Sequence, residues 1–369
     1  MQGSENAPKP NGARLGKLEA LRGFVALYVV MHHTLPHHIP VAGFDLGLIL
    51  RFGQEAVILF FLLSGFVINF SFQMSRDRSW SRYLLKRALR IYTLLVPVLV
   101  LSYLCASLAE GRWLNAQLPQ LIGNLLMLQD VESLKPGVLV SPYMGNSPLW
   151  SLSYEWWFYI LFYPITMWIQ SWRARAVSVF VLSLVATVLY TVWPTFLPRL
   201  LAYFGIWWVG VYLSELYLRG EIGRLKAWVM PIAAMAGCSA LLLVGVLLYR
   251  SRGGALQIGV HPVLELRHFA FTAVVLMGAW AWRRASWLGF DRLFGPFAVL
   301  ASTSYALYIS HYFLLSYAGY LRFIPWPWLE QLGYCVTLAA VAYLLELKLY
   351  PAVHAAVFAP KPAAPAVPA

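Results

Sequence analysis

Residues 227–249 read Ala-Trp-Val-Met-Pro-Ile-Ala-Ala-Met-Ala-Gly-Cys-Ser-Ala-Leu-Leu-Leu-Val-Gly-Val-Leu-Leu-Tyr, a run of 23 residues without a charged side chain. A helix needs about 20 mostly apolar residues to cross the roughly 30 Å hydrocarbon core of a bilayer. This stretch therefore predicts a membrane-spanning helix.

The composition of the whole chain agrees, because 60% of its 369 residues are hydrophobic and only 12% are charged. These values are far from those of a water-soluble domain, so we exclude a soluble α/β enzyme. We predict an all-α polytopic membrane protein with about ten transmembrane helices. The predicted spans are residues 18–35, 55–73, 88–108, 150–170, 176–194, 200–218, 227–249, 267–283, 297–320 and 329–349.

The net charge of +13 would also fit a nucleic-acid-binding protein, but the basic residues gather in alternate loops. With the N-terminus in the cytoplasm, nineteen of the 28 Lys and Arg residues fall on the cytoplasmic side and eight fall outside. This asymmetry follows the positive-inside rule. An even number of spans returns the chain to the cytoplasm, so we expect both termini there and no nucleic-acid partner.

The two ends of the chain differ from the membrane domain, which we place at residues 18–350. Residues 1–17 lack the features of a secretory signal and are interpreted as a cytosolic tail. Residues 351–369 are interpreted as an Ala/Pro-rich tail, expected to be disordered from about Ala359. In the longest predicted outer segment, Leu118 to Leu128 is a candidate for a short interfacial helix.

Ionisable groups inside a membrane are costly, so each one is a candidate functional residue. In the first span, Glu19 and Arg22 are three residues apart on one helical face, where they can neutralise each other. His33 follows Arg22 after ten intervening residues, roughly 16 Å along a helix. We therefore expect Arg22 near the cytosol and His33 toward the outer leaflet.

Three later spans carry further groups of this kind. Glu155 is expected near the level of His33, where a carboxylate can orient an imidazole or hold a hydroxyl substrate. Arg87 and Arg90 lie three residues apart at the cytosolic mouth, and two guanidinium groups there suit phosphate. His311 is a second histidine among apolar neighbours.

Five short motifs follow one another in a fixed order. They are Arg22 with His33, Phe60-Phe61-Leu62-Leu63-Ser64-Gly65-Phe66-Val67-Ile68, Arg87 with Arg90, Pro148-Leu149-Trp150-Ser151-Leu152 with Glu155 and Phe158-Tyr159, and Ser304-Tyr305 with Tyr308 and His311. Each motif is weak alone, but together and in this order they resemble the membrane acyltransferase family 3. The resemblance covers about residues 15–350.

The resemblance implies an enzyme that moves an acyl group from acyl coenzyme A, held at the cytosolic face, to a sugar hydroxyl. Arg87, Arg90 and Arg22 would hold the coenzyme phosphates while the thioester reaches inward to His33. His33 would be the general base for the acceptor hydroxyl or would be transiently acylated, and both remain open. Glu155 is the candidate group that orients His33.

Other motif residues receive supporting roles. Tyr305 or a backbone amide is expected to support the oxyanion, whereas Ser64 and His311 are interpreted first as packing residues. Glu19 stands where the family usually has Asp. Trp156 and Trp157 stand where the family usually has a Glu or Gln pair, so no second acidic group is assigned there. The donor substrate is acyl coenzyme A, with acetyl as the default because the family mostly uses it, and no permanently bound cofactor is expected.

A metal site is the first alternative, because four histidines occur at positions 32, 33, 37 and 38. Pro36 interrupts the helix, however, and Asp45 is the one nearby carboxylate that could complete such a site, so we predict no metal. A transporter or export component for a lipid-linked glycan is the second alternative, because buried charges also line transport pathways. Paired inverted repeats, which would favour a transporter, are not evident.

The expected location is a bacterial inner membrane. Some members of the family carry a fused extracytoplasmic hydrolase-like domain, and here we expect none and direct acylation of a glycan. O-antigen, exopolysaccharide, a lipid-linked sugar and a small glycoside such as a macrolide all remain open as acceptors, and so does the oligomeric state.

Overall fold

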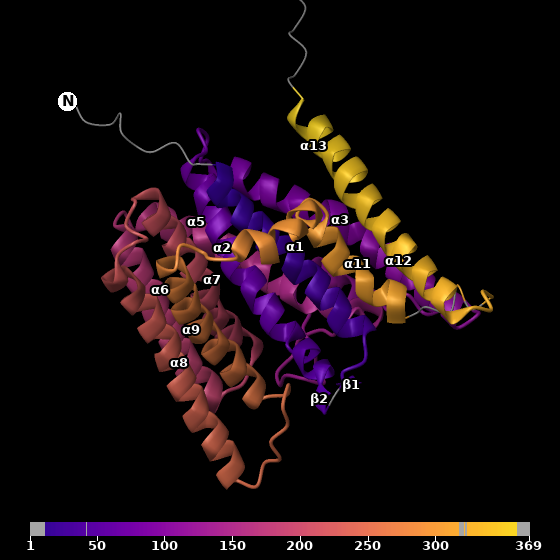
Figure 1. The fold of residues 1–369 in the computed structure, drawn as a ribbon, viewed down its shortest axis with the longest axis horizontal. Helices are drawn as coiled ribbons and strands as arrows, with labels where there is room; N and C mark the ends of the chain where they lie inside the picture. The colour runs from indigo at the N-terminus through magenta and orange to yellow at the C-terminus, as the bar shows by residue number, and fades with distance from the viewer. Residues whose placement is uncertain (1–11, 42, 317–320, 322, 360–369) are drawn as a thin grey trace, which may run out of the picture.

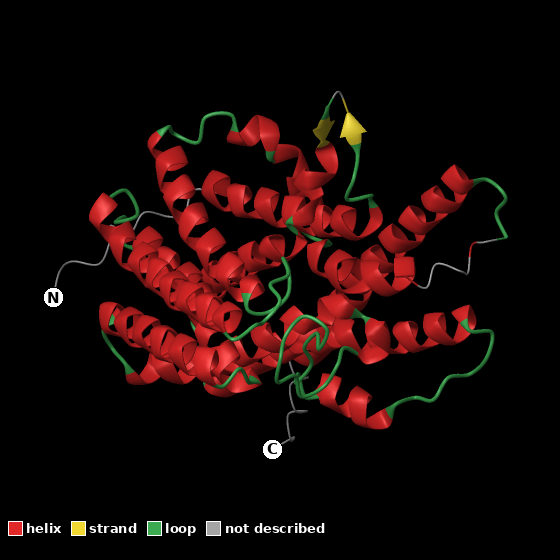
Figure 2. Ribbon diagram, turned by 90° about the horizontal axis from the view of Figure 1, so that it is seen from below, coloured by secondary structure: helices red, strands yellow, loops and turns green. Residues whose placement is uncertain are grey.

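The computed structural model describes residues 12–41, 43–316, 321 and 323–359. Its helices, in chain order, are α1 (Gly12–Thr34), η1 (Leu46–Arg51), α2 (Gly53–Gln73), α3 (Trp80–Ala109), α4 (Leu118–Leu125), η2 (Tyr143–Gly145), η3 (Ser147–Leu149), α5 (Trp150–Trp168), α6 (Trp172–Val192), α7 (Phe196–Leu218), α8 (Leu225–Ser251), α9 (Val263–Arg284), α10 (Phe290–Leu293), η4 (Gly295–Leu300), α11 (Ser304–Ser316), α12 (Pro327–Tyr343), the π-helical segment η6 (Leu344–Leu349) and α13 (Tyr350–Phe358). In the described ranges the strands are β1 (Pro40–Val41) and β2 (Phe44–Asp45), which form a small antiparallel hairpin (Figure 2).

The predicted all-α membrane architecture is confirmed at this level. Every predicted span coincides at least in part with a helix, and seven helices in the described part of the chain are long and apolar enough to cross a bilayer. The remaining predicted spans correspond to α1, α5 and α11. These helices carry Arg22, Glu155 and His311, so three of the candidate site residues lie on helices outside that set of seven.

Two predicted boundaries differ from the structure. The span predicted at 297–320 begins later, because residues 295–300 form the 3-10 turn η4 and α11 starts only at Ser304. Its end falls at residues 317–320, which lie outside the described residues. The last span continues past 349, because α12, η6 and α13 form one helical run to Phe358. Part of the predicted C-terminal tail, 351–358, is therefore helical, and residues 360–369 lie outside the described chain.

Close contact between α2 and α7 fixes the centre of the bundle. A side chain on Gly65 would place its Cβ 2.0 Å from the backbone oxygen of Trp207, and one on Gly210 would lie 2.0 Å from that of Leu62. Small residues let membrane helices approach in this way. Trp207 is fully buried beside this contact, so α7 occupies the interior with α2 against it (Figure 1).

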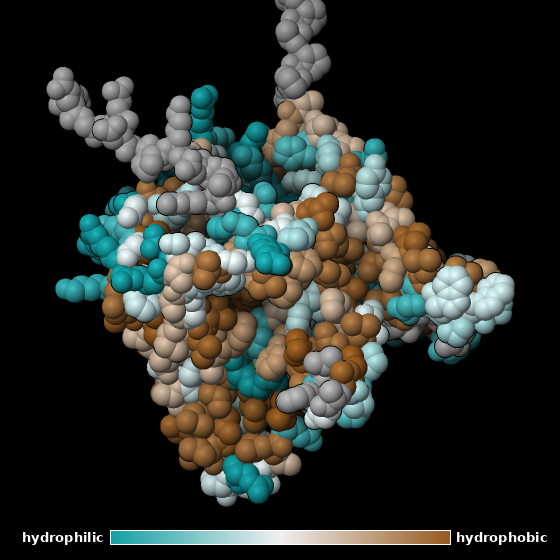
Figure 3. Space-filling view, viewed as in Figure 1, coloured by the Kyte–Doolittle hydropathy of each residue, from teal (hydrophilic) through white to brown (hydrophobic). Residues whose placement is uncertain are grey.

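The outer helices expose apolar side chains at helical spacing. On α6, Val177, Val181 and Val185 follow one another every four residues and are about half exposed. A stripe of this kind in a membrane protein faces lipid tails. The space-filling view shows apolar side chains over the lower left, where α8 lies, and polar side chains toward the top (Figure 3).

The predicted segment 118–128 contains a short helix, α4, at Leu118–Leu125, and the segment after it folds back onto the bundle. The indole Nε1 of Trp157 donates to the backbone oxygen of Met127 at 2.8 Å, and Ser153 Oγ donates to that of Gln129 at 2.7 Å. These bonds fasten the outer segment to α5, the helix that carries Glu155.

Candidate active site

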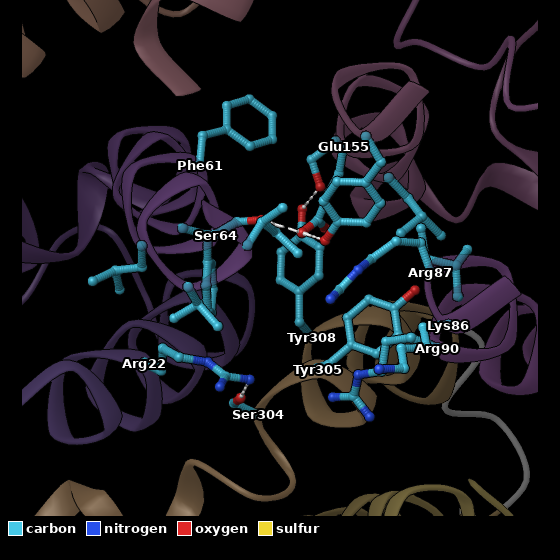
Figure 4. A pocket seen from close by; sticks show the side chains of 18 of the residues that line it. Arg22, Phe61, Ser64, Lys86, Arg87, Arg90, Glu155, Ser304, Tyr305 and Tyr308 are labelled. Carbon is cyan, nitrogen blue, oxygen red and sulfur yellow. Dashed lines mark hydrogen bonds between the residues drawn. The ribbon is translucent and has the colours of Figure 1, made fainter. Parts of the chain in front are cut away.

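A cavity of about 370 Å³ lies between α1, α2, α3, α5, α11 and α13 (Figure 4). Its described lining residues are Arg22, Phe60, Phe61, Leu63, Ser64, Val67, Ile68, Lys86, Arg87, Arg90, Ile91, Ser151, Leu152, Glu155, Tyr159, Ser304, Tyr305, Tyr308, Tyr350 and His354. Helices from both ends of the chain thus bring residues of all five sequence motifs to one space, although neither His33 nor His311 is among the described lining residues.

Glu155 lies in a hydrogen-bonded group that the sequence did not predict. Ser64 Oγ donates to Glu155 Oε1 at 2.6 Å, and the hydroxyl of Tyr159 donates to the same oxygen. Trp207 Nε1 donates to Ser64 Oγ at 3.2 Å. Ser64 is therefore more than a packing residue, because it connects the carboxylate on α5 to α7. Tyr159 could have been found from the sequence, since it lies four residues after Glu155 on the same helical face.

The predicted pair Arg87 and Arg90 does line the cavity from one face of α3, but the two differ in their partners among the described residues. Arg90 forms an ion pair with Glu346 in η6, whose other oxygen accepts from the backbone N–H of Ala306 at 3.1 Å. Arg87 donates to Ser71 Oγ at 3.2 Å, and its Nε has no hydrogen-bond partner in the described part of the chain. Sequence reasoning missed Glu346, which is distant in sequence from Arg90.

Arg22 enters the same cavity from α1 and donates to Ser304 Oγ at 3.4 Å. The expectation that Glu19 neutralises Arg22 is wrong. Glu19 is exposed, and no ion pair joins the two side chains among the residues that the structure describes. The ring of Tyr305 lies 5.1 Å from the Arg90 guanidinium, and its buried hydroxyl has no partner within the described ranges.

His33 and His311 form a pair, with His311 Nε2 3.2 Å from His33 Nδ1. The Nδ1 atoms of His33 and His311 lie 2.9 Å and 2.7 Å from the backbone oxygens of Val29 and Tyr308. Because a carbonyl oxygen only accepts, each neutral ring carries its proton on Nδ1. The single proton on His33 Nδ1 is therefore shared between the Val29 backbone oxygen and His311 Nε2, and the Nε2 of His33 keeps a lone pair that has no hydrogen-bond partner among the described residues. His33 is exposed while His311 is fully buried.

The two histidines lie beyond the inner end of the cavity. Neither is among its described lining residues, whereas Tyr308, one turn before His311, is. The Tyr308 ring is 5.6 Å from Phe60 and 6.1 Å from His311, and its hydroxyl bonds Ser151 Oγ and the Pro148 backbone oxygen at 2.8 and 2.9 Å. Tyr308 therefore lies between the cavity and His311, and we call Tyr308 together with the Phe60 ring packed against it the partition.

The expected contact between Glu155 and His33 is wrong. Glu155 bonds Ser64 and Tyr159 on the cavity side of the partition, while His33 meets His311 beyond it. Helix topology predicts a similar depth for both groups, but depth along the membrane normal does not fix lateral position within a bundle. The orienting group next to His33 is another imidazole.

His37 and His38 lie in the loop that leads from α1 to the hairpin. Asp45 Oδ1 accepts from the backbone N–H groups of Ile39 and Gly47, and Oδ2 accepts from His38 and Arg51. The Ile39 amide and then the His38 ring lower the pKa of the Asp45 carboxyl. This carboxylate is used to close the loop between α1 and α2.

A second polar group, which we call the buried ion cluster, comprises Asp130, Lys135, Tyr154 and Arg199. Asp130 accepts from Lys135 Nζ at 2.9 Å through one oxygen, and its other oxygen accepts from the Tyr154 hydroxyl at 2.6 Å and lies 2.9 Å from Arg199. Lys135 and Arg199 were counted from the sequence only as outer-face charges. Both are fully buried, and the cluster joins the outer segment to α5 and α7 beside Glu155.

Comparison with known proteins points to an acyltransferase family. A family profile described as "Acyltransferase domain" matches residues 15–347. The chain is also 35% identical over 159 residues to acyltransferase MdmB from Streptomyces mycarofaciens. That match covers 42% of this chain and 39% of the relative, so the chain spans well under half of that protein. No solved structure matches the chain.

Proposed function

The chain belongs to the membrane acyltransferase family 3, and from this premise we propose that it moves an acyl group from acyl coenzyme A to a sugar hydroxyl. The proposed setting is a bacterial inner membrane with both termini in the cytoplasm, and the proposed acyl group is acetyl. The proposal rests on one observation. The cavity is lined by cationic side chains at one end, and at the other end the rings of Phe60 and Tyr308 separate it from His33, whose Nε2 carries a lone pair.

The cavity chemistry fits an anionic donor. Lys86, Arg87 and Arg22 have no carboxylate partner among the described residues, whereas Arg90 is compensated by Glu346. Coenzyme A carries a diphosphate and a 3′-phosphate, and guanidinium and ammonium groups bind such oxygens. Tyr305 lies at the level of Arg90, so its free hydroxyl fits the coenzyme arm better than an oxyanion near His33.

His33 is proposed as the general base. Its Nε2 takes the proton of the acceptor hydroxyl while that oxygen attacks the thioester carbonyl. The tetrahedral intermediate then expels the coenzyme thiolate, which receives the proton back from His33. His311 is a positioning residue, because its Nε2 is a second acceptor for the His33 Nδ1 proton, beside the Val29 backbone oxygen, and so holds the imidazole ring in its orientation. A transient acyl group on Nε2 would use the same lone pair.

The partition adds a requirement to this mechanism. Phe60 and Tyr308 separate the cavity from His33, so the acyl end of the donor must displace these rings to react. Water in the cavity is separated from the base in the same way, which would limit loss of the thioester by hydrolysis.

The test uses sealed inverted vesicles that expose the cytosolic face to acetyl coenzyme A labelled in its acetyl group. His33→Ala should lower label transfer to glycan or lipid by about 100-fold or more, because a general base contributes about that much. His38→Ala is the matched control, since that side chain is 76% exposed at the hairpin and should leave transfer unchanged. Protein-dependent transfer that is equal in His33→Ala and wild type would reject the His33 mechanism. Transfer by wild type no higher than in vesicles without the protein, with longer acyl donors also tried, would favour a glycan transporter.

A further inference from the structure

Helices α3 and α13 pack side by side as an antiparallel pair with a defined register. The Arg82 guanidinium lies 4.0 Å from the ring of Phe358, and Arg90 lies 4.9 Å from the ring of Tyr350. Each step of four residues along α3 matches a step of four back along α13. The register therefore sets Lys86 opposite His354, halfway between these two contacts.

This middle position opens on the cavity. Lys86 and His354 both line it and are half-buried, and Tyr350 lines it one turn further in. The residues at the two flanking positions are engaged with each other through cation–π contacts, and Arg90 is also paired with Glu346. No carboxylate partner of Lys86 occurs within the described ranges. The cavity mouth thus presents an uncompensated ammonium group opposite the His354 ring, whose centroid lies 4.6 Å from that of Phe358 and 5.9 Å from that of Tyr350.

The chemistry of this position selects one part of the donor. An ammonium group binds a phosphate monoester as a point charge, and a flat ring stacks on a nucleobase. In coenzyme A these two features occur together only at the 3′-phosphoadenosine end, while the pantetheine arm has neither. Tyr350 and His354 follow residue 347, where the match to the family ends, so that match assigns them no role.

We propose that Lys86, Tyr350 and His354 bind the nucleotide end of the donor, with the 3′-phosphate on Lys86 and the adenine stacked on His354. The proposal rests on acyl coenzyme A being the donor. With the nucleotide held at this mouth, the pantetheine arm extends past Arg90 and Tyr305 toward Ser64 and the partition.

The test measures binding of coenzyme A, 3′-dephospho-coenzyme A and pantetheine to the purified full-length protein in detergent. His354→Ala should weaken coenzyme A binding by about tenfold, as expected for a lost stacking contact. Lys86→Met should weaken coenzyme A but leave dephospho-coenzyme A unchanged. Val357→Ala is the control, since Val357 is exposed on the same helix. Acetyl transfer from acetyl-pantetheine should be the same in all of these proteins.

Wild-type affinity for coenzyme A in His354→Ala and Lys86→Met would overturn the proposal, and so would equal binding of coenzyme A and pantetheine by the wild type. Failure of the proposed function looks different. If His33→Ala transfers acetyl as well as wild type while coenzyme A binding still depends on Lys86 and His354, the nucleotide site stands and the catalytic assignment falls.

Discussion

The buried ion cluster allows a quantitative prediction about stability. Asp130 is fully buried and is the carboxylate that compensates both Lys135 and Arg199, whose side chains are 1% and 0% exposed. Asp130→Asn keeps the size of the side chain but removes its charge. Both cations then remain buried without their carboxylate.

Removing one partner of a buried ion pair typically costs about 3–5 kcal/mol, because the remaining charge is left desolvated. Two cations share Asp130, so we expect the free energy of unfolding to fall by at least about 3 kcal/mol. That change lowers the ratio of folded to unfolded protein by about 100-fold or more. Adding Lys135→Met to Asp130→Asn returns the net charge of the cluster to its original value and should recover part of the loss.

The assay is equilibrium unfolding of the purified protein in mixed micelles, measured by tryptophan fluorescence. Asp291→Asn is the control, because Asp291 pairs with Lys17 at the surface with its side chain 83% exposed, where an ion pair contributes little. The prediction is refuted if Asp130→Asn unfolds like the control, or if the double variant is no more stable than the single one.

Three further outcomes are expected at the site and in the bundle. His311→Ala should lower acyl transfer by about tenfold or more, because the His33 ring loses the side chain that holds its orientation through Nδ1. His311→Gln can still accept from Nδ1–H and should restore part of the rate in the vesicle assay. With the native cysteines replaced, a cysteine introduced by His33→Cys should react with a membrane-impermeant maleimide from the outer side only. Adding Phe60→Ala should make this cysteine reactive from the cytosolic side as well. Labelling from both sides without Phe60→Ala would contradict the partition. Gly65→Ala should cost roughly 1–3 kcal/mol of stability by forcing α2 from α7, measured by the same unfolding assay, while Gly278→Ala, which meets nothing within 4 Å, should be neutral.

The sequence predicted the helices well because the cost of burying polar backbone in lipid makes a long apolar run a reliable signal. It was less accurate where the run included polar residues. The stretch from 297 is apolar enough to resemble a span. In the structure, however, Pro296 lies in the first turn of the short helix η4, and the hydroxyl residues at 302–304 separate η4 from α11. Ser and Thr compete for backbone hydrogen bonds, so they favour such breaks over helix interiors.

Some residues of the candidate site can be predicted from their spacing along one helix, and others depend on contacts between helices that are distant in sequence. Arg87 and Arg90 could be assigned to one face because their spacing alone decides it, and both line the cavity. Glu346 could not be assigned, because its contacts with Arg90 and Ala306 depend on how the helical run from α12 through η6 packs against α3 and α11. Spacing along one helix predicts which side chains share a face, but only the packing of the bundle decides which faces meet.

The positions of Arg22 and His33 depend both on spacing along α1 and on the packing of α1 against α11. Helix geometry alone sets them roughly 16 Å apart along α1. In the structure Arg22 meets Ser304 at the start of α11, and His33 meets His311 two turns later, with Tyr308 between these levels. A donor bound through its phosphates at the level of Arg22 can therefore reach His33 only by extending along α11 past Tyr308. In the proposed mechanism Tyr308, which is hydrogen-bonded to Ser151 and Pro148, bounds the cavity and would have to move before the thioester meets the base.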